Sequence, residues 1–257
     1  MKYVSTRGQA PVLEFGDVLL AGLATDGGLY VPDEWQPQPE IGLDTSYVDA
    51  AVAVMAPYVA PSIDEPTFRA MATEAYATFD HPDVCPVRPI DDGLWLLELF
   101  HGPTIAFKDV ALQLVGRLFD HELTKRGERA TIVVATSGDT GSAAIEACRG
   151  RESLDIVVLH PAGRVSDVQR KQMTTVQEPN VHNVAVEGTF DDCQDLVKAM
   201  FADVAFREAV NLSAMNSINW ARVMAQVVYY VTAAKAVGAG SPVAYSVHTG
   251  NLGNVFA

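Results

Sequence analysis

Positive charge, cysteine and long apolar runs are all scarce in this sequence. Lys and Arg number 18 against 32 Asp and Glu, which gives a formal net charge of −14. Nucleic acids and anionic membrane surfaces need clustered Lys and Arg, so the composition argues against both as partners. No apolar run approaches the ~20 residues that span a membrane, and the opening MKYVSTRGQAPVLEF lacks the apolar core of a signal peptide. We therefore expect a soluble, cytoplasmic protein.

The cysteines, Cys85, Cys148 and Cys193, are odd in number and far apart. Their spacing resembles neither a disulfide framework nor the paired Cys/His spacing of a zinc site. We expect reduced, mostly buried thiols and no metal site.

An α/β fold with parallel sheets flanked by helices is predicted from residue 94 onward. Apolar runs of strand length, without polar alternation, are each followed by a helical pattern, which is typical of a parallel sheet covered on both faces. The expected strands are 94–100, 130–136, 154–160, 181–188 and 242–248. Two of the expected helices begin near Phe107 and at 252, and the others span 142–150, 164–176, 190–209 and 218–238. Such sheets bind ligands at the carboxyl ends of their strands, where the glycine-rich turns of this sequence fall.

The first 80 or so residues show mainly helical patterns. The segment 81–93, HPDVCPVRPIDDG, follows them and contains three prolines, which we expect to exclude regular structure there. A linker between domains and a surface loop within one domain are equally consistent with this composition.

Lys108 lies in HGPTIAFKDVALQLVG, 101–116, where a tight turn leads into a helix. A surface lysine would explain this position. A lysine partly desolvated at a sheet edge can instead have its pKa lowered and act as an amine that forms a Schiff base. The stretch alone leaves both interpretations open.

Two glycine turns follow predicted strands. In TSGDTG, 136–141, glycines allow a close approach of the backbone to a ligand, and the first N–H groups of the helix can hold an anion. Alternatively, Asp139 or Thr140 merely caps that helix. In HTGNLGN, 248–254, glycines and amides suit a phosphate, although a simple tight turn is equally consistent. A Schiff-base lysine, an anion site and a phosphate site together are what pyridoxal phosphate requires.

Five motifs closely resemble those of the threonine synthases, in the order of that family: HGPTIAFKDVALQ, ATSGDTGSAA, LHPAGRVSDVQRKQM, GTFDDCQDLVK and NSINWARVMAQVVYY. The stretches YVSTRG and VLLAGLATDGGLYVP resemble the N-terminal segment of the bacterial and fungal type. The resemblance covers essentially the whole chain. It implies the tryptophan-synthase-β-like fold (fold type II) of pyridoxal-phosphate enzymes. The domains would be a mainly helical segment at 1–85, parts of a large pyridoxal-phosphate-binding domain at 86–130 and 240–257, and a small α/β domain at 131–239.

The resemblance also assigns roles to matching residues. Lys108 would form the Schiff base with pyridoxal phosphate and serve as the catalytic base and acid. The cofactor would further be bound by Asp139, Gly250, Asn251, Leu252, Gly253 and Asn254. The substrate would be bound by Ser137, Gly138, Thr140, Gly141, Ser166, Gln169, Asn216, Ser217, Asn219 and Arg222. Arg222 suits a substrate phosphate because a planar guanidinium matches that anion; a surface cation on a helix is the alternative.

The implied reaction converts O-phospho-L-homoserine and water into L-threonine and phosphate by a γ-elimination followed by replacement at the β carbon. Two other functions remain open. One is a related lyase that acts on another phosphorylated hydroxy amino acid. The other is a non-catalytic binding module, against which the presence of Lys108 argues.

The sequence departs from the family in two places. The phosphate loop of the family resembles PTGNFGD, whereas His248, Leu252 and Asn254 stand at three of its positions here. Family members also continue well beyond the position of Ala257 and include a Ser or Thr near the pyridine nitrogen of the cofactor. We therefore expect the N-terminal portion of a longer enzyme, with little activity by itself. The sequence does not predict an oligomeric state.

Overall fold

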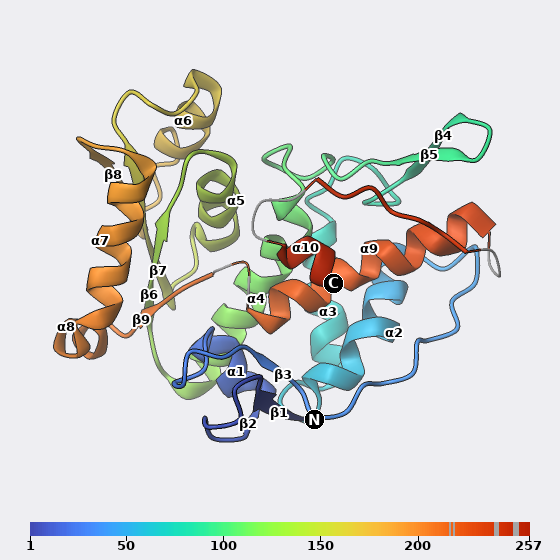
Figure 1. Ribbon diagram of the computed structural model, residues 1–257, viewed down its shortest axis with the longest axis horizontal. Helices are drawn as coiled ribbons and strands as arrows, with labels where there is room; N and C mark the ends of the chain where they lie inside the picture. The colour runs from blue at the N-terminus through green and yellow to red at the C-terminus, as the bar shows by residue number, and fades with distance from the viewer. Residues whose placement is uncertain (216, 218, 239–241, 249–251) are drawn as a thin grey trace. The chain divides into compact units, whose positions relative to one another are not determined.

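The computed structural model describes residues 1–215, 217, 219–238, 242–248 and 252–257. The chain divides into two compact units, and Figure 1 shows its course. Unit 1 comprises Met1–Leu114 and Ser217–Ala257, and unit 2 comprises Val115–Asn216. The division into 1–85, 86–130 with 240–257, and 131–239 stays a prediction.

Unit 2 contains the predicted parallel sheet. Its described residues form four parallel strands in the order β8-β7-β6-β9. The helices α5 and α7 lie on opposite sides of this sheet (Figure 1). Ile132 and Val133 point to opposite faces of β6 and are only 0% and 5% exposed, which explains the continuous apolar pattern. The strands are β6 (Ala130–Ala135), β7 (Leu154–Pro161), β8 (Val181–Val186) and β9 (Leu212–Ser213), and the helices are α5 (Asp139–Cys148), α6 (Asp167–Thr174), α7 (Phe190–Ala202) and α8 (Val204–Ala209).

The helix expected at 190–209 is two helices, α7 and α8, because Asp203 interrupts it. Asp203 has an extended backbone, with φ −78° and ψ 98°. Its carboxylate accepts a hydrogen bond from the Phe206 N–H at 3.0 Å and so caps a new helix. The apolar periodicity continues through this break, so the pattern alone does not reveal it.

Unit 1 combines helices with a small antiparallel sheet, β2-β1-β3, that the sequence did not predict. Helix α2 packs against α3 and α9. Large side chains fill the core, among them Tyr3, Phe15 and Phe68, each with no exposed surface. The elements are β1 (Lys2–Ser5), β2 (Leu13–Glu14), α1 (Phe15–Ala21), β3 (Tyr30–Pro32), α2 (Tyr47–Val59), α3 (Glu65–Tyr76) and α9 (Trp220–Gly238).

The segment around residue 90 differs from the prediction. β4 (Val87–Asp91) and β5 (Leu94–Leu97) form an antiparallel pair, so the apolar run at 94–100 is not a strand of a parallel sheet. Pro89 lies within β4, and the expectation that prolines exclude regular structure from 81–93 is wrong. A strand with an unpaired edge tolerates a proline, and the pairing register shifts between Pro89 and Asp91.

Two further elements lead to the site. Helix α4 (Lys108–Arg126) begins in unit 1, and α10 (Gly253–Phe256) begins within the last residues of the predicted phosphate loop. The strand expected at 242–248 is not formed. A strand needs a hydrogen-bonded neighbour, and none of the described strands pairs with this segment. Within the described part of the chain, no helix combines the length and apolarity needed to cross a membrane.

Candidate functional site

Lys108 is the first residue of α4, at the predicted junction of turn and helix. The residue is half-buried, and its ammonium nitrogen lies 4.3 Å from the centroid of the Phe107 ring. This is cation–π distance. The exposure of Lys108 is intermediate between that of a surface lysine and that of a core residue. Such partial exposure suits an amine that must meet a ligand.

The turn before Lys108 is held by the carboxylate of Asp109, a residue that sequence reasoning missed. Asp109 has no exposed surface and accepts hydrogen bonds from both the N–H (2.8 Å) and the hydroxyl (2.7 Å) of Thr104. A Cβ on Gly102 would lie 2.5 Å from the Asp109 Cβ. Ile105, between them, has a φ of 61°, which is rare for a β-branched residue. The turn that leads to Lys108 is therefore tightly determined by its own contacts.

The predicted phosphate loop is described in part. Asn216, Gly250 and Asn251 lie outside the described residues. Gly253 starts α10, and a Cβ on it would lie 2.7 Å from the carbonyl oxygen of Ser217. The loop therefore needs glycine at this position, and the structure brings Gly253 and Ser217 together as predicted site residues.

Asn254 holds the same loop in place. It is 9% exposed, and its side-chain amide donates to the His248 carbonyl at 2.7 Å. Its own carbonyl accepts a hydrogen bond from the Tyr230 hydroxyl on α9 at 2.5 Å. Leu252 precedes the helix with a left-handed φ of 57° and an exposed side chain. These contacts fix the end of the loop rather than present its side chains to a ligand.

The other predicted turn lies in unit 2, between β6 and α5. The buried Thr136 hydroxyl accepts hydrogen bonds from the N–H groups of Gly138 (3.0 Å) and Gly141 (2.9 Å). A Cβ on Gly141 would lie 2.5 Å from the Thr136 methyl carbon. Ser137 is exposed, and Asp139 accepts from the Thr140 N–H at 3.1 Å. The turn winds tightly onto the start of α5, where helix N–H groups favour anions.

Ser166 caps the N-terminus of α6, which packs against α5, and Gln169 lies in the first turn of α6. The Ser166 hydroxyl caps α6 and contacts the Gln169 side-chain oxygen at 3.0 Å. Gln169 in turn lies against Gly138, where a Cβ would come within 2.2 Å of its side-chain oxygen. The structure thus brings both residues to the predicted anion turn within unit 2.

Asn219 and Arg222 lie at the start of α9 in unit 1. Asn219 is 1% exposed; its amide donates to the Leu19 carbonyl at 2.8 Å and accepts from the Ala221 N–H at 3.0 Å. Both ends of this amide therefore stabilise the fold. Arg222 is 6% exposed, so it is not the surface cation considered as an alternative.

The cysteines offer no competing nucleophile. All three are buried and unpaired, as predicted from their spacing. Burial raises the pKa of the Cys85 and Cys148 thiols to about 12, which keeps them protonated. No group of three or more His, Cys, Asp or Glu side chains that could hold a metal ion occurs among the residues described.

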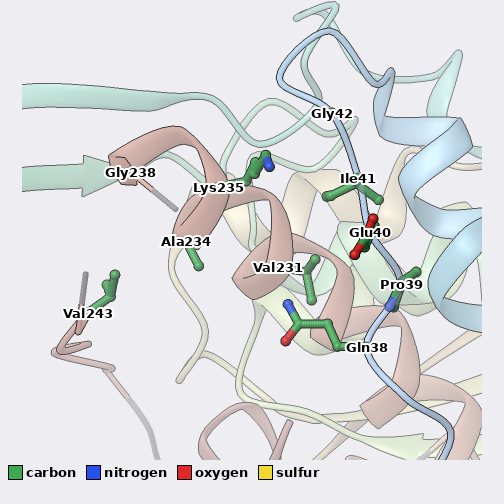
Figure 2. A pocket seen from close by; sticks show the side chains of 10 residues that line it. All are labelled: Gln38, Pro39, Glu40, Ile41, Gly42, Val231, Ala234, Lys235, Gly238 and Val243. Atoms are coloured by element: carbon green, nitrogen blue, oxygen red, sulfur yellow. The ribbon is translucent and has the colours of Figure 1, made fainter. Parts of the chain in front are cut away.

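Unit 1 also contains a cavity of about 630 Å³. It is formed by the segment Gln38–Gly42, by α9 and by Val243, and Figure 2 shows the side chains that line it. Its charged groups are Glu40, on the segment, and Lys235, on α9. None of the predicted site residues that the structure describes lines this cavity, so we do not assign the site to it.

Two protein families match this chain, and together they cover nearly all of it. A family model described as "Threonine synthase N terminus" matches residues 2–76, and one described as "Pyridoxal-phosphate dependent enzyme" matches residues 86–257. A threonine synthase of Pseudomonas aeruginosa is 56% identical over 100% of this chain and 56% of its own length. For a threonine synthase of Schizosaccharomyces pombe the identity is 44%, over 100% of this chain and 53% of that protein.

Solved structures give the same result. The crystal structure of a PLP-bound threonine synthase from Brucella melitensis matches with a TM-score of 0.93 and 56% identity, over 100% of this chain and 56% of that one. The yeast threonine synthase matches with a TM-score of 0.89 and 40% identity, over 99% of this chain and 54% of that one. The chain spans about half the length of the curated relatives it matches.

Proposed function

The chain belongs to the pyridoxal-phosphate dependent enzymes, and from this premise we propose that it acts as a threonine synthase, with Lys108 as the lysine that binds the cofactor. The substrate would be O-phospho-L-homoserine, and the products L-threonine and phosphate. The observation that carries the proposal is the half-buried lysine at the end of a tightly held turn. The agreement of relatives named threonine synthase over the full chain supports it.

The described residues fit pyridoxal phosphate. Lys108 supplies an amine for the cofactor aldehyde, and Gly253 lies where a Cβ would meet backbone, as a loop wound closely around a small anion requires. We assign the cofactor phosphate to the loop 250–254 and the polar edge of the ring to Asp139. When bound, pyridoxal phosphate supplies the electron sink that stabilises negative charge at the substrate α carbon.

The chain's own residues then bind substrate and move protons. The Lys108 amine removes the proton at the α carbon and returns it. The turn 137–141 holds the substrate carboxylate, because the N–H groups at the start of α5 favour anions. We assign Ser166 and Gln169 to the same end of the substrate, since Gln169 lies against Gly138.

Arg222 is assigned to the substrate phosphate, together with Asn216 and Ser217. A buried guanidinium in the first turn of α9 is a suitable fork for that anion. Asn219 acts indirectly, by fixing the start of α9 against Leu19. Because the chain spans about half the length of its relatives, we further propose that the 257 residues alone bind the cofactor but turn over little.

The substrate assignment is tested by titration. The chain is loaded with pyridoxal phosphate, and the Schiff-base absorbance is followed on adding O-phospho-L-homoserine, L-homoserine or O-phospho-L-serine. Mass spectrometry detects any L-threonine formed. We expect O-phospho-L-homoserine to change the spectrum at the lowest concentration. An equal response to O-phospho-L-serine would contradict the proposed substrate, and no Schiff base at all would contradict the proposed cofactor.

A further inference from the structure

His101 lies between two carboxylates just before the turn that carries Lys108. Its Nε2 is 2.8 Å from Glu98 Oε2, and its Nδ1 is 3.0 Å from Asp80 Oδ1. The His101 and Glu98 side chains are only 15% and 16% exposed, whereas Asp80 is 82% exposed. A neutral imidazole can donate from one nitrogen only. Two carboxylates at hydrogen-bond distance are therefore fully satisfied only by the charged imidazolium.

Two rings and two further charged side chains surround this cluster. The His81 ring lies 4.9 Å and the Phe100 ring 4.8 Å from the His101 ring, centroid to centroid. The charged side chains are Arg88, whose Nε lies 3.8 Å from Glu98 Oε2, and Asp83, whose Oδ2 lies 3.9 Å from His81 Nδ1. The hydrogen bond to Glu98, with a smaller contribution from Asp80, raises the pKa of His101 above its ordinary value.

This cluster is continuous with the turn that leads to Lys108. The His101 carbonyl accepts a hydrogen bond from the Asp80 N–H at 3.0 Å, which ties this point of the chain to the end of the helical segment. The next residue, Gly102, packs against the side chain of Asp109. Asp109 immediately follows Lys108 in the sequence. A change in the His101 contacts would therefore be transmitted to the turn over two residues.

We propose that the charged His101, bridging Glu98 and Asp80, is a positioning residue that fixes the turn carrying Lys108 in the conformation that accepts pyridoxal phosphate. The proposal rests on the proposed function of Lys108. We assign His101 no contact with the cofactor or with the reacting atoms. Because the pKa of His101 is raised in the folded protein, the bridge is complete at about pH 6, which is below the ordinary histidine pKa of 6.5 and above the ordinary range of carboxyl groups. It is lost as the pH rises through the raised pKa of His101.

The test compares pyridoxal-phosphate affinity across pH in the wild-type chain, His101→Gln and the matched control His182→Gln, since His182 is exposed on β8 in unit 2. Any pH effect that the three proteins share cancels in the ratio of variant to wild-type Kd, so this ratio isolates the contribution of His101. We expect His101→Gln to bind pyridoxal phosphate about tenfold more weakly at about pH 6, within the usual range for coupled sites. This ratio should fall towards one at high pH, while the control stays at one throughout.

The outcomes separate the two proposals. A Kd ratio for His101→Gln that is one at every pH, or raised equally at every pH, overturns the positioning role, because a purely structural defect has no such pH dependence. Failure of wild-type Lys108 to form a borohydride-reducible adduct overturns the proposed function instead. If His101→Gln does not fold, Glu98→Gln serves in its place. It should lower the pKa of His101, read by NMR, and move the loss of pyridoxal-phosphate affinity to lower pH; an unmoved profile overturns the role.

Discussion

Replacing Asp109 with alanine should loosen the turn that leads to Lys108 more than any surface substitution. The Asp109 carboxylate is fully buried and accepts two hydrogen bonds from one residue, Thr104, at 2.8 and 2.7 Å. Both bonds are lost in Asp109→Ala. The turn then keeps its left-handed Ile105 without the contacts that enforce it.

The size of the effect follows from these bonds. A hydrogen bond to a charged group contributes about 1.5–3 kcal/mol, and a buried group left without a partner costs a similar amount. Thr104 is half-buried, so water can replace part of what the carboxylate supplied. We expect Asp109→Ala to lower the free energy of unfolding by about 2–4 kcal/mol. Asp109→Asn should cost only about 1 kcal/mol, since the amide can still accept from the Thr104 N–H and donate to its hydroxyl.

The assay is urea unfolding of Asp109→Ala, Asp109→Asn, Thr104→Val and the double variant Asp109→Ala/Thr104→Val. Thr104→Val removes only the hydroxyl, so the cycle isolates the 2.7 Å bond and should give a coupling of about 1–2 kcal/mol. Each variant is also tested for binding of pyridoxal phosphate, which should weaken in the order of the lost stability. A cost below about 0.5 kcal/mol for Asp109→Ala, or a coupling near zero, would refute the reasoning.

Three other predictions concern the remaining turns and the N-terminal segment. Thr136→Val removes the acceptor for two loop N–H groups and should cost about 1–3 kcal/mol in urea unfolding, together with weaker binding of O-phospho-L-homoserine. Gly253→Ala places a Cβ 2.7 Å from the Ser217 carbonyl oxygen; it should weaken pyridoxal-phosphate binding about tenfold and lower the free energy of unfolding by about 1–3 kcal/mol. Burial alone would raise the pKa of Asp26, but hydrogen bonds from backbone N–H groups and a hydroxyl lower it to about 2. The ionised Asp26 therefore stabilises the fold above its ordinary pKa of 3.8, and this stabilisation is lost as the pH falls towards 2. Asp26→Asn should unfold at a lower urea concentration than the wild-type chain at pH 5, and the difference in urea midpoint should shrink as the pH falls. A difference that stays constant with pH would contradict the assignment.

Much of the fold was predictable because apolar runs report burial directly. The strands β6 and β7 are largely apolar runs with mostly buried side chains. By contrast, β8 is partly exposed, and the two-residue β9 was not predicted. The antiparallel pair β4-β5 was not predictable, because its side chains are largely exposed and Pro89 lies within a strand. The strand expected at 242–248 illustrates a different limit: an apolar run indicates that a segment can pair, not that a partner strand is present.

The candidate site was predictable where glycine or lysine is required by chemistry. Gly138, Gly141 and Gly253 each lie where a Cβ would clash, which matches the reason for proposing their turns. Asp109 and His101 were missed. An acidic residue in the first turn of a helix is ordinary, and the contacts of His101 with Asp80 depend on tertiary structure that local patterns do not record.

The central claim is that Lys108 is the cofactor-binding lysine, and one measurement tests it most directly. The chain is mixed with equimolar pyridoxal phosphate, reduced with borohydride, digested and analysed by mass spectrometry. We predict a pyridoxyl adduct chiefly on the Lys108 peptide, with little labelling of Lys2, Lys125, Lys171, Lys198 or Lys235, and loss of the main adduct in Lys108→Ala. An unmodified Lys108 peptide beside labelled surface lysines would contradict the account.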